Sequence, residues 1–122
     1  MRTLCLVLTL LLLQTPVMGQ ERPKAPCLMR VAYTGSMIPT LVGGEVVRVL
    51  ACAIENVPVG SVVVSERIGA GIYPCHRVIY KGRAANGGTY LITKGDNNRE
   101  RDFIPVSKED FIGVVDLPIK PP

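Results

Sequence analysis

Apolar residues occur along the chain in short runs that are rich in valine and isoleucine and are separated by glycine, proline and charged residues. Such runs predict β-strands, because β-branched side chains pack well on a pleated sheet while Gly and Pro end strands. The predicted strands cover residues 29–33, 45–50, 61–65, 72–80, 89–93 and 111–115. The one candidate for helical structure is a single turn at residues 106–110. The pattern therefore predicts an all-β fold, a barrel or a sandwich, in a single domain.

The N-terminal end of the chain differs from this pattern. Residues 1–19 contain the basic Arg2, an apolar run from Leu4 to Leu13 and a final small residue, Gly19. This order is typical of a signal peptide or a short N-terminal anchor, and the run is shorter than the roughly 20 apolar residues that span a bilayer. The body of the chain is therefore expected outside the cytoplasm, periplasmic or secreted, or tethered to the membrane by an uncleaved N-terminal segment. The predicted parts are a leader at 1–19, a linker at 20–28, the folded domain at 29–117 and a proline-rich tail at 118–122.

Charge and composition exclude some functions. The formal net charge is +4 and becomes +3 without residues 1–19, because Arg2 is the one charged residue there. The chain has no Trp, two Phe and four Tyr, and it has no dense basic run, so a nucleic-acid-binding module is not indicated. Outside the leader, an odd number of cysteines leaves open one disulfide with one free thiol, or no disulfide. These cysteines are Cys27, Cys52 and Cys75.

Metal sites are not indicated by the spacing of potential ligands. The chain has a single histidine and lacks a Cys-x-x-Cys or His-Glu-x-x-His motif. The segment from Asp96 onward begins like a calcium loop, but Arg101 occupies the glycine position and Ser107 the position of the bidentate glutamate. We therefore expect neither a metal nor another cofactor.

Candidate catalytic residues lie in three polar segments. A tight turn at residues 35–39 places Ser36 between a glycine and a proline, which can expose its hydroxyl. His76 is expected on an extended strand, where it would point away from its neighbour Cys75. Asp96 lies in a polar loop, and Asp102 precedes two apolar residues, where a carboxylate needs a partner. Serine, histidine and carboxylate fill the roles of nucleophilic hydrolysis, although Ser36 or His76 taken alone is more typical of an ordinary turn or a structural residue.

Five segments in the same order resemble the type I signal peptidases, in particular the branch of the endoplasmic reticulum and the archaea. They are Gly35-Ser36-Met37-x-Pro39, residues 44–47, residues 59–63, residues 76–79, and residues 93–98 followed by Asp102. The resemblance covers residues 31–117 and implies a small β barrel or coiled sheet of the signal-peptidase type. Glu45 departs from the aspartate that is usual in the second segment, and the chain is too short for the cap domain of the larger bacterial enzymes.

The resemblance also implies roles for individual residues. Ser36 would be the nucleophile, His76 the general base and Asp102 the carboxylate that orients it. Asp96 would support the site, and the backbone N–H of Ser36 with the Thr34 hydroxyl would stabilise the oxyanion. Other motif residues expected around the site are Gly35, Met37, Pro39 and Arg77. Lys81 and Lys94 stay open as alternative bases.

These roles imply a serine endopeptidase that cleaves exported proteins or pre-proteins after small residues. The expected partners are polypeptide substrates and a membrane surface, without nucleic acid. Two other classes of protein stay open. One is a catalytically inactive β module that binds extended peptides by strand addition, and the other is a secreted structural domain held together by a disulfide.

Overall fold

The computed structural model describes residues 22–67 and 72–119, which form one six-stranded antiparallel sheet. A 3-10 turn, η1 (Ile54–Asn56), lies between the second and third strands. Within the described residues there is no α-helix, so the prediction of an all-β fold in a single small domain is confirmed. The strands are β1 (Cys27–Arg30), β2 (Val46–Leu50), β3 (Val62–Ser65), β4 (Cys75–Arg83), β5 (Thr89–Lys94) and β6 (Phe111–Val115).

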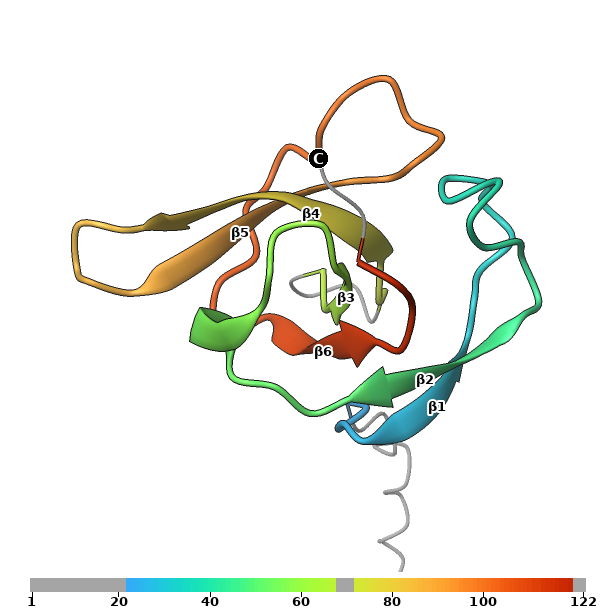
Figure 1. Cartoon of the computed structure of the whole chain (residues 1–122), viewed down its shortest axis with the longest axis horizontal. Helices are drawn as coiled ribbons and strands as arrows, with labels where there is room; N and C mark the ends of the chain where they lie inside the picture. The colour runs from blue at the N-terminus through green and yellow to red at the C-terminus, as the bar shows by residue number, and fades with distance from the viewer. Residues whose placement is uncertain (1–21, 68–71, 120–122) are drawn as a thin grey trace, which may run out of the picture.

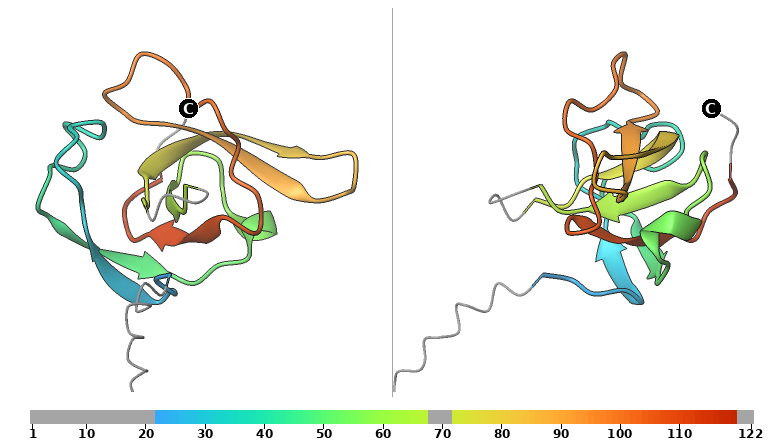
Figure 2. Two further views of the ribbon diagram at one scale, coloured as in Figure 1. Left: turned by 180° about the vertical axis from the view of Figure 1, so that it is seen from behind. Right: turned by 90° about the vertical axis from the view of Figure 1, so that its left-hand side faces the viewer.

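The order of the strands across the sheet is β1-β2-β6-β3-β4-β5, with every neighbouring pair antiparallel. The β1–β2 ribbon and the β4–β5 ribbon lie on opposite sides of the central strands β3 and β6 (Figure 1). The far end of the β4–β5 hairpin extends beyond the rest of the domain (Figure 2). The sheet is coiled but not closed, because β1 and β5 are its two ends. Because β1 pairs only with β2 in the sheet, its other edge is not paired with a strand among the described residues. The chain continues from β1 into the segment that contains Ser36.

The central strand β3 is buried on both faces. Val62 and Val64 belong to one apolar cluster, which also contains Met37 and Leu41 from the β1–β2 connection, while Val63 belongs to a second cluster on the other face. Successive side chains of a strand point to opposite faces, so an unbroken run of valines fits a strand covered on both sides. Strand β2 instead alternates between exposed and buried positions along its whole length. The coiling of the sheet thus buries the centre and leaves the β1–β2 ribbon half exposed.

Some boundaries differ from the prediction. Strand β1 begins at Cys27, inside the predicted linker 20–28, because Cys27 and Leu28 pair with Val49 and Arg48 of β2. Arg22 is also fixed, since its guanidinium donates to the carbonyl oxygens of Glu109 and Phe111. The described part of the predicted linker is therefore packed on the sheet.

The predicted helical turn lies between β5 and β6. Residues 106–110 form a turn closed by the Asp110 and Phe111 N–H groups, which donate to the Ser107 carbonyl oxygen. The predicted leader at 1–19 and residues 120–122 of the proline-rich tail lie outside the described residues. In the described ranges, no helix has the length and apolar character needed to span a membrane. Cys27, Cys52 and Cys75 are free thiols in the structure.

Candidate active site

Ser36, His76 and Asp102 come from three separate parts of the chain and meet at one end of the sheet. Ser36 lies in the connection between β1 and β2, His76 is the second residue of β4, and Asp102 lies in the connection between β5 and β6. The antiparallel pairing of β4 with β5 sets Arg77 opposite Lys94, which brings the start of one strand next to the end of the other. The chain beyond β5 therefore passes beside His76.

The three side chains form a continuous hydrogen-bonded path. His76 Nε2 lies 3.0 Å from Ser36 Oγ, and His76 Nδ1 lies 2.6 Å from Asp102 Oδ2. The side chain of His76 is 11% exposed and that of Asp102 is 22% exposed. When Nδ1 donates its proton to Asp102, Nε2 is the lone-pair nitrogen and can accept the Ser36 proton. This is the arrangement of a nucleophile, a base and an orienting carboxylate.

Asp102 is held by Thr93, a residue of the motif segment 93–98 to which the sequence analysis assigned no role. The Thr93 hydroxyl donates to Asp102 Oδ2 at 2.6 Å, and the Asp102 N–H donates to the Thr93 carbonyl oxygen at 2.7 Å. Burial opposes ionisation of Asp102, but the hydrogen bonds from His76 and Thr93 and the electrostatic interactions with His76 and Arg67 outweigh it and lower its pKa. Asp102 is therefore a carboxylate at neutral pH, as an acceptor for the His76 N–H must be. The sequence signal for Thr93 was its place at the start of the motif segment 93–98, and the structure adds that it is buried.

Thr34 lies beside the nucleophile. Its hydroxyl donates to Ser36 Oγ at 3.1 Å and accepts the Ser36 backbone N–H at 3.3 Å. The Ser36 N–H and the Thr34 hydroxyl, the two groups expected to stabilise an oxyanion, are therefore adjacent in the structure. Gly35 has a φ of 77°, a conformation that favours glycine and turns the chain sharply before Ser36.

Arg77, the neighbour of His76 in β4, forms a nearly buried ion pair with Asp96. Arg77 Nε and Nη2 donate to the two oxygens of Asp96 at 2.8 and 2.7 Å, and Arg77 Nη1 donates to the Gly60 carbonyl oxygen at 2.8 Å. The hydrogen bond to Asp96 raises the pKa of Arg77. Asp96 also accepts from the Thr40 hydroxyl, and its N–H donates to the sulfur of Met37 at 3.3 Å. The pair therefore ties the strand that carries His76 to the segment that carries Ser36.

The other motif residues complete the Ser36 segment. Met37 is buried in the core, with 2% of its surface exposed, whereas Pro39 is exposed and follows a cis peptide bond. Gly95 packs directly on the turn, because a Cβ at this position would lie 2.6 Å from the Ser36 carbonyl oxygen. Asn97, a residue of the motif segment 93–98 to which no role was assigned from the sequence, also contacts this turn. The segment 95–97 therefore packs against the Ser36 turn and is hydrogen-bonded to it.

The two lysines that were open as bases have other partners. Lys81 Nζ donates to the carbonyl oxygens of Glu55 and Val57 at 2.9 and 2.8 Å, and Lys94 Nζ donates to that of Gly95 at 3.1 Å. Burial raises the pKa of the Cys75 thiol to about 12, so this neighbour of His76 stays protonated and is a poor nucleophile. The described residues contain no cluster of three or more potential metal ligands.

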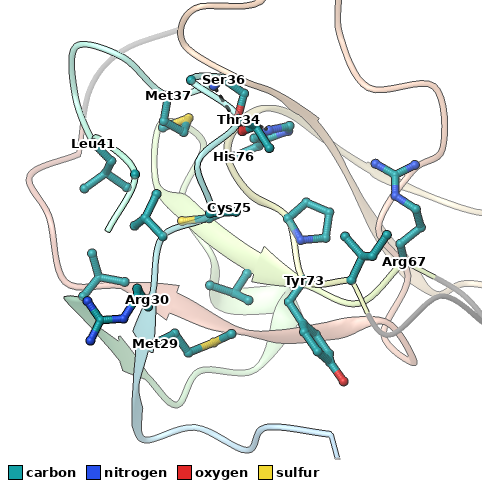
Figure 3. Close-up of a pocket in the computed structure, with 18 residues that line it drawn as sticks. Met29, Arg30, Thr34, Ser36, Met37, Leu41, Arg67, Tyr73, Cys75 and His76 are labelled. Atoms are coloured by element: carbon teal, nitrogen blue, oxygen red, sulfur yellow. Dashed lines mark hydrogen bonds between the residues drawn. The ribbon is translucent and has the colours of Figure 1, made fainter. Parts of the chain in front are cut away.

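A cavity of about 460 Å³ opens beside Ser36 and His76. Figure 3 shows both residues at one end of the cavity and Met29 and Tyr73 at the other. Most of the lining side chains are apolar, and they come from β1 and its continuation, from β2 and β3, and from the segment that leads into β4. Apolar clefts with a few convergent polar groups are the usual form of a ligand site. The Ser36 hydroxyl thus lies at the end of a groove, not on an open surface.

No protein-family model, curated protein or solved structure matches this chain. The functional conclusion therefore depends on the geometry of these residues and on the resemblance of the short motifs.

Proposed function

We propose that the chain is a serine endopeptidase with His76 as its general base, acting on polypeptides outside the cytoplasm. The observation that carries the proposal is the path from Ser36 Oγ through His76 to Asp102, with distances of 3.0 and 2.6 Å. A serine hydroxyl needs such a base, because it is a weak nucleophile while it keeps its proton. The position of this path at the end of an apolar groove gives the reaction a place to bind substrate.

The proposed reaction uses each group in turn. Ser36 Oγ attacks the scissile carbonyl carbon while His76 Nε2 takes its proton, and the carbonyl oxygen becomes an oxyanion. The Thr34 side chain then rotates so that its hydroxyl donates to the oxyanion and no longer to Ser36 Oγ. The Ser36 N–H keeps its direction and donates to the oxyanion in place of Thr34 Oγ1. His76 returns the proton to the leaving amine, and water hydrolyses the acyl-enzyme in a second cycle. Asp102 stays ionised throughout and stabilises the imidazolium.

The substrate proposed for this site is an extended polypeptide. One wall of the groove is formed by Met29, Arg30 and the two residues that follow, which belong to the terminal strand β1 and its continuation. A terminal strand has unpaired backbone groups that an added peptide strand can use. Substrates that are exported proteins, cut after small residues near the membrane surface, are proposed from the resemblance of the motifs.

A peptide hydrolysis assay tests the proposal. Internally quenched peptides with small residues at the cleavage site are incubated with the wild-type protein, with Ser36→Ala and with Ser107→Ala as a matched control remote from the site. We expect Ser36→Ala to lower kcat by about 10⁴-fold or more, because removal of a triad member leaves only oxyanion stabilisation and binding. Ser107→Ala is expected to retain activity.

The same assay distinguishes the non-enzymatic alternative. Binding of peptides without cleavage by the wild-type protein would contradict the proposal and favour a peptide-binding module. Equal activity of Ser36→Ala and the wild type would show that the hydrolysis belongs to a contaminant or to another site.

A further inference from the structure

Asn97 holds the turn of the nucleophile by two hydrogen bonds to consecutive carbonyl groups. Its side-chain Nδ2 donates to the Gly35 carbonyl oxygen at 3.0 Å, and its backbone N–H donates to the Ser36 carbonyl oxygen at 2.8 Å. The Gly35 carbonyl oxygen accepts one further bond, from the Ile38 N–H at 3.3 Å. The side chain of Asn97 has no hydrogen bond to His76 or Asp102 among the described residues.

The hydrogen bond from the Asn97 side chain is made to the peptide unit that also contains the Ser36 N–H. The carbonyl of Gly35 and the N–H of Ser36 belong to the same planar peptide unit, and in a trans peptide they point in opposite directions. Fixing the direction of the carbonyl therefore fixes the direction of the N–H. A hydrogen bond to the carbonyl also polarises the peptide unit and makes its N–H a better donor.

We propose that Asn97 is a positioning residue that aims the Ser36 N–H at the oxyanion. The proposal depends on the peptidase activity proposed above. During attack, the new bond joins Ser36 Oγ to the carbonyl carbon, the π electrons of that carbonyl move to its oxygen, and the serine proton passes to His76. The negative charge forms where the Ser36 N–H must point. Asn97 touches neither the substrate nor the reacting atoms, and it acts through the peptide unit of Gly35 and Ser36.

The size of the effect follows from the contacts. Loss of an entire oxyanion donor typically lowers kcat by about 10²–10³-fold. Replacement of the Asn97 side chain leaves its backbone bond to Ser36 in place, so the donor is loosened and not removed. We therefore expect a decrease in kcat of about tenfold, with KM unchanged.

The experiment compares Asn97→Asp and Asn97→Ala with the wild type and with Asn86→Asp. Asn86 lies in the β4–β5 turn, where its Oδ1 accepts the Gly88 N–H, a role that aspartate can keep. The readouts are kcat and KM for a quenched peptide, the Ki of a matching peptide boronate, the pH profile of kcat/KM, and the thermal midpoint. The boronate is used because its tetrahedral adduct on the serine places a charged oxygen in the position of the oxyanion.

We expect both Asn97 variants to lose about tenfold in kcat and a similar factor in boronate affinity, with the pH profile and KM unchanged and Asn86→Asp like the wild type. Unchanged boronate affinity, or an effect confined to KM or the thermal midpoint, would overturn the assignment while leaving the peptidase proposal intact. A wild-type protein that neither cleaves peptides nor binds the boronate would overturn both.

Discussion

Ser36 lies in a connection without regular structure, residues 31–45, whereas His76 lies within the longest strand of the sheet. His76 is paired with Val63 of β3, and its neighbour Arg77 is paired with Lys94 of β5, so backbone ladders fix the base from both sides. The turn of Ser36 has no such ladder. It is held by the buried side chains of Met37 and Leu41 and by hydrogen bonds from the segment 95–97.

Because of this difference, substitutions near His76 and substitutions near Ser36 should have different effects. Damage to the strands that carry His76 should reduce the stability of the whole domain, because the ladders are part of the core. Damage to the contacts of segment 95–97 should displace the nucleophile by a small distance and leave the fold in place. Small displacements matter, since misplacing a reacting group by about 1 Å can cost about 10²-fold in rate.

The largest effect is expected on the side of the base. His76→Ala should lower kcat by about 10⁴-fold or more, because His76 Nε2 is the one ring or amine nitrogen hydrogen-bonded to Ser36 Oγ among the described residues. Lys94→Ala is the matched comparison, since Lys94 Nζ donates to the Gly95 carbonyl oxygen and, among the described residues, has no hydrogen bond to Ser36. Peptide hydrolysis measures both. Activity that survives His76→Ala and disappears in Lys94→Ala would transfer the role of base to the lysine.

The second effect concerns the ion pair that connects the two regions. Asp96→Asn leaves the nearly buried guanidinium of Arg77 without a counter-charge, which typically costs about 3–5 kcal/mol of stability. Glu66→Gln removes the counter-charge of Arg22 in a more exposed pair, where we expect at most about 1 kcal/mol. Urea denaturation measures both free energies of unfolding. Equal losses in the two variants would show that burial of the pair is unimportant.

The third effect should fall on the nucleophile alone. Gly95→Ala places a Cβ against the Ser36 carbonyl oxygen, so the turn must shift, and we expect kcat to fall by about 10²-fold. Gly88→Ala in the β4–β5 turn is the control, because there the closest atom is the end of the Asn86 side chain. Kinetics and circular dichroism are compared. A Gly95→Ala protein that is fully active would argue against close support of the turn by this segment.

The smallest effect is on the pH dependence of stability. The folded pKa of Asp102 is lowered, so its contribution to stability is complete above the ordinary carboxyl pKa and is lost as the pH falls through the lower folded value. Asp102→Asn should therefore flatten the loss of stability in acid below about pH 4. Urea denaturation as a function of pH measures this slope. An unchanged slope in the variant would show that the carboxylate gains nothing from His76 and Thr93 on folding.

Much of the fold follows from local patterns. Alternating and β-branched runs predict the six strands, because both patterns are local: they depend on residues that are neighbours in the sequence. The starts of β1 and β4 were misplaced, since the first depends on pairing of Cys27 with β2 and the second on pairing of Cys75 with Val64 of β3. Partners of this kind are distant in the chain and leave no local signal.

The site was less accessible to sequence reasoning. Individually, Ser36, His76 and Asp102 looked like ordinary residues, and only the order of the motifs suggested a common role. Thr93 and Asn97 lie in the motif segment 93–98, but no role could be assigned to them from the sequence, because their roles consist of hydrogen bonds between segments whose approach is set by the β4–β5 pairing. Residues that could take part in catalysis can be suggested by their side-chain type, but the residues that position them are identified only from contacts in the folded structure.

Covalent labelling tests the central claim most directly. A fluorophosphonate probe reacts with a serine whose proton is taken by a neighbouring base, and mass spectrometry locates the adduct. The account predicts one adduct, on Ser36, formed rapidly by the wild-type protein and by Lys94→Ala and at least about 10³-fold more slowly by His76→Ala. An adduct on another serine, or a rate on Ser36 that does not depend on His76, would contradict it.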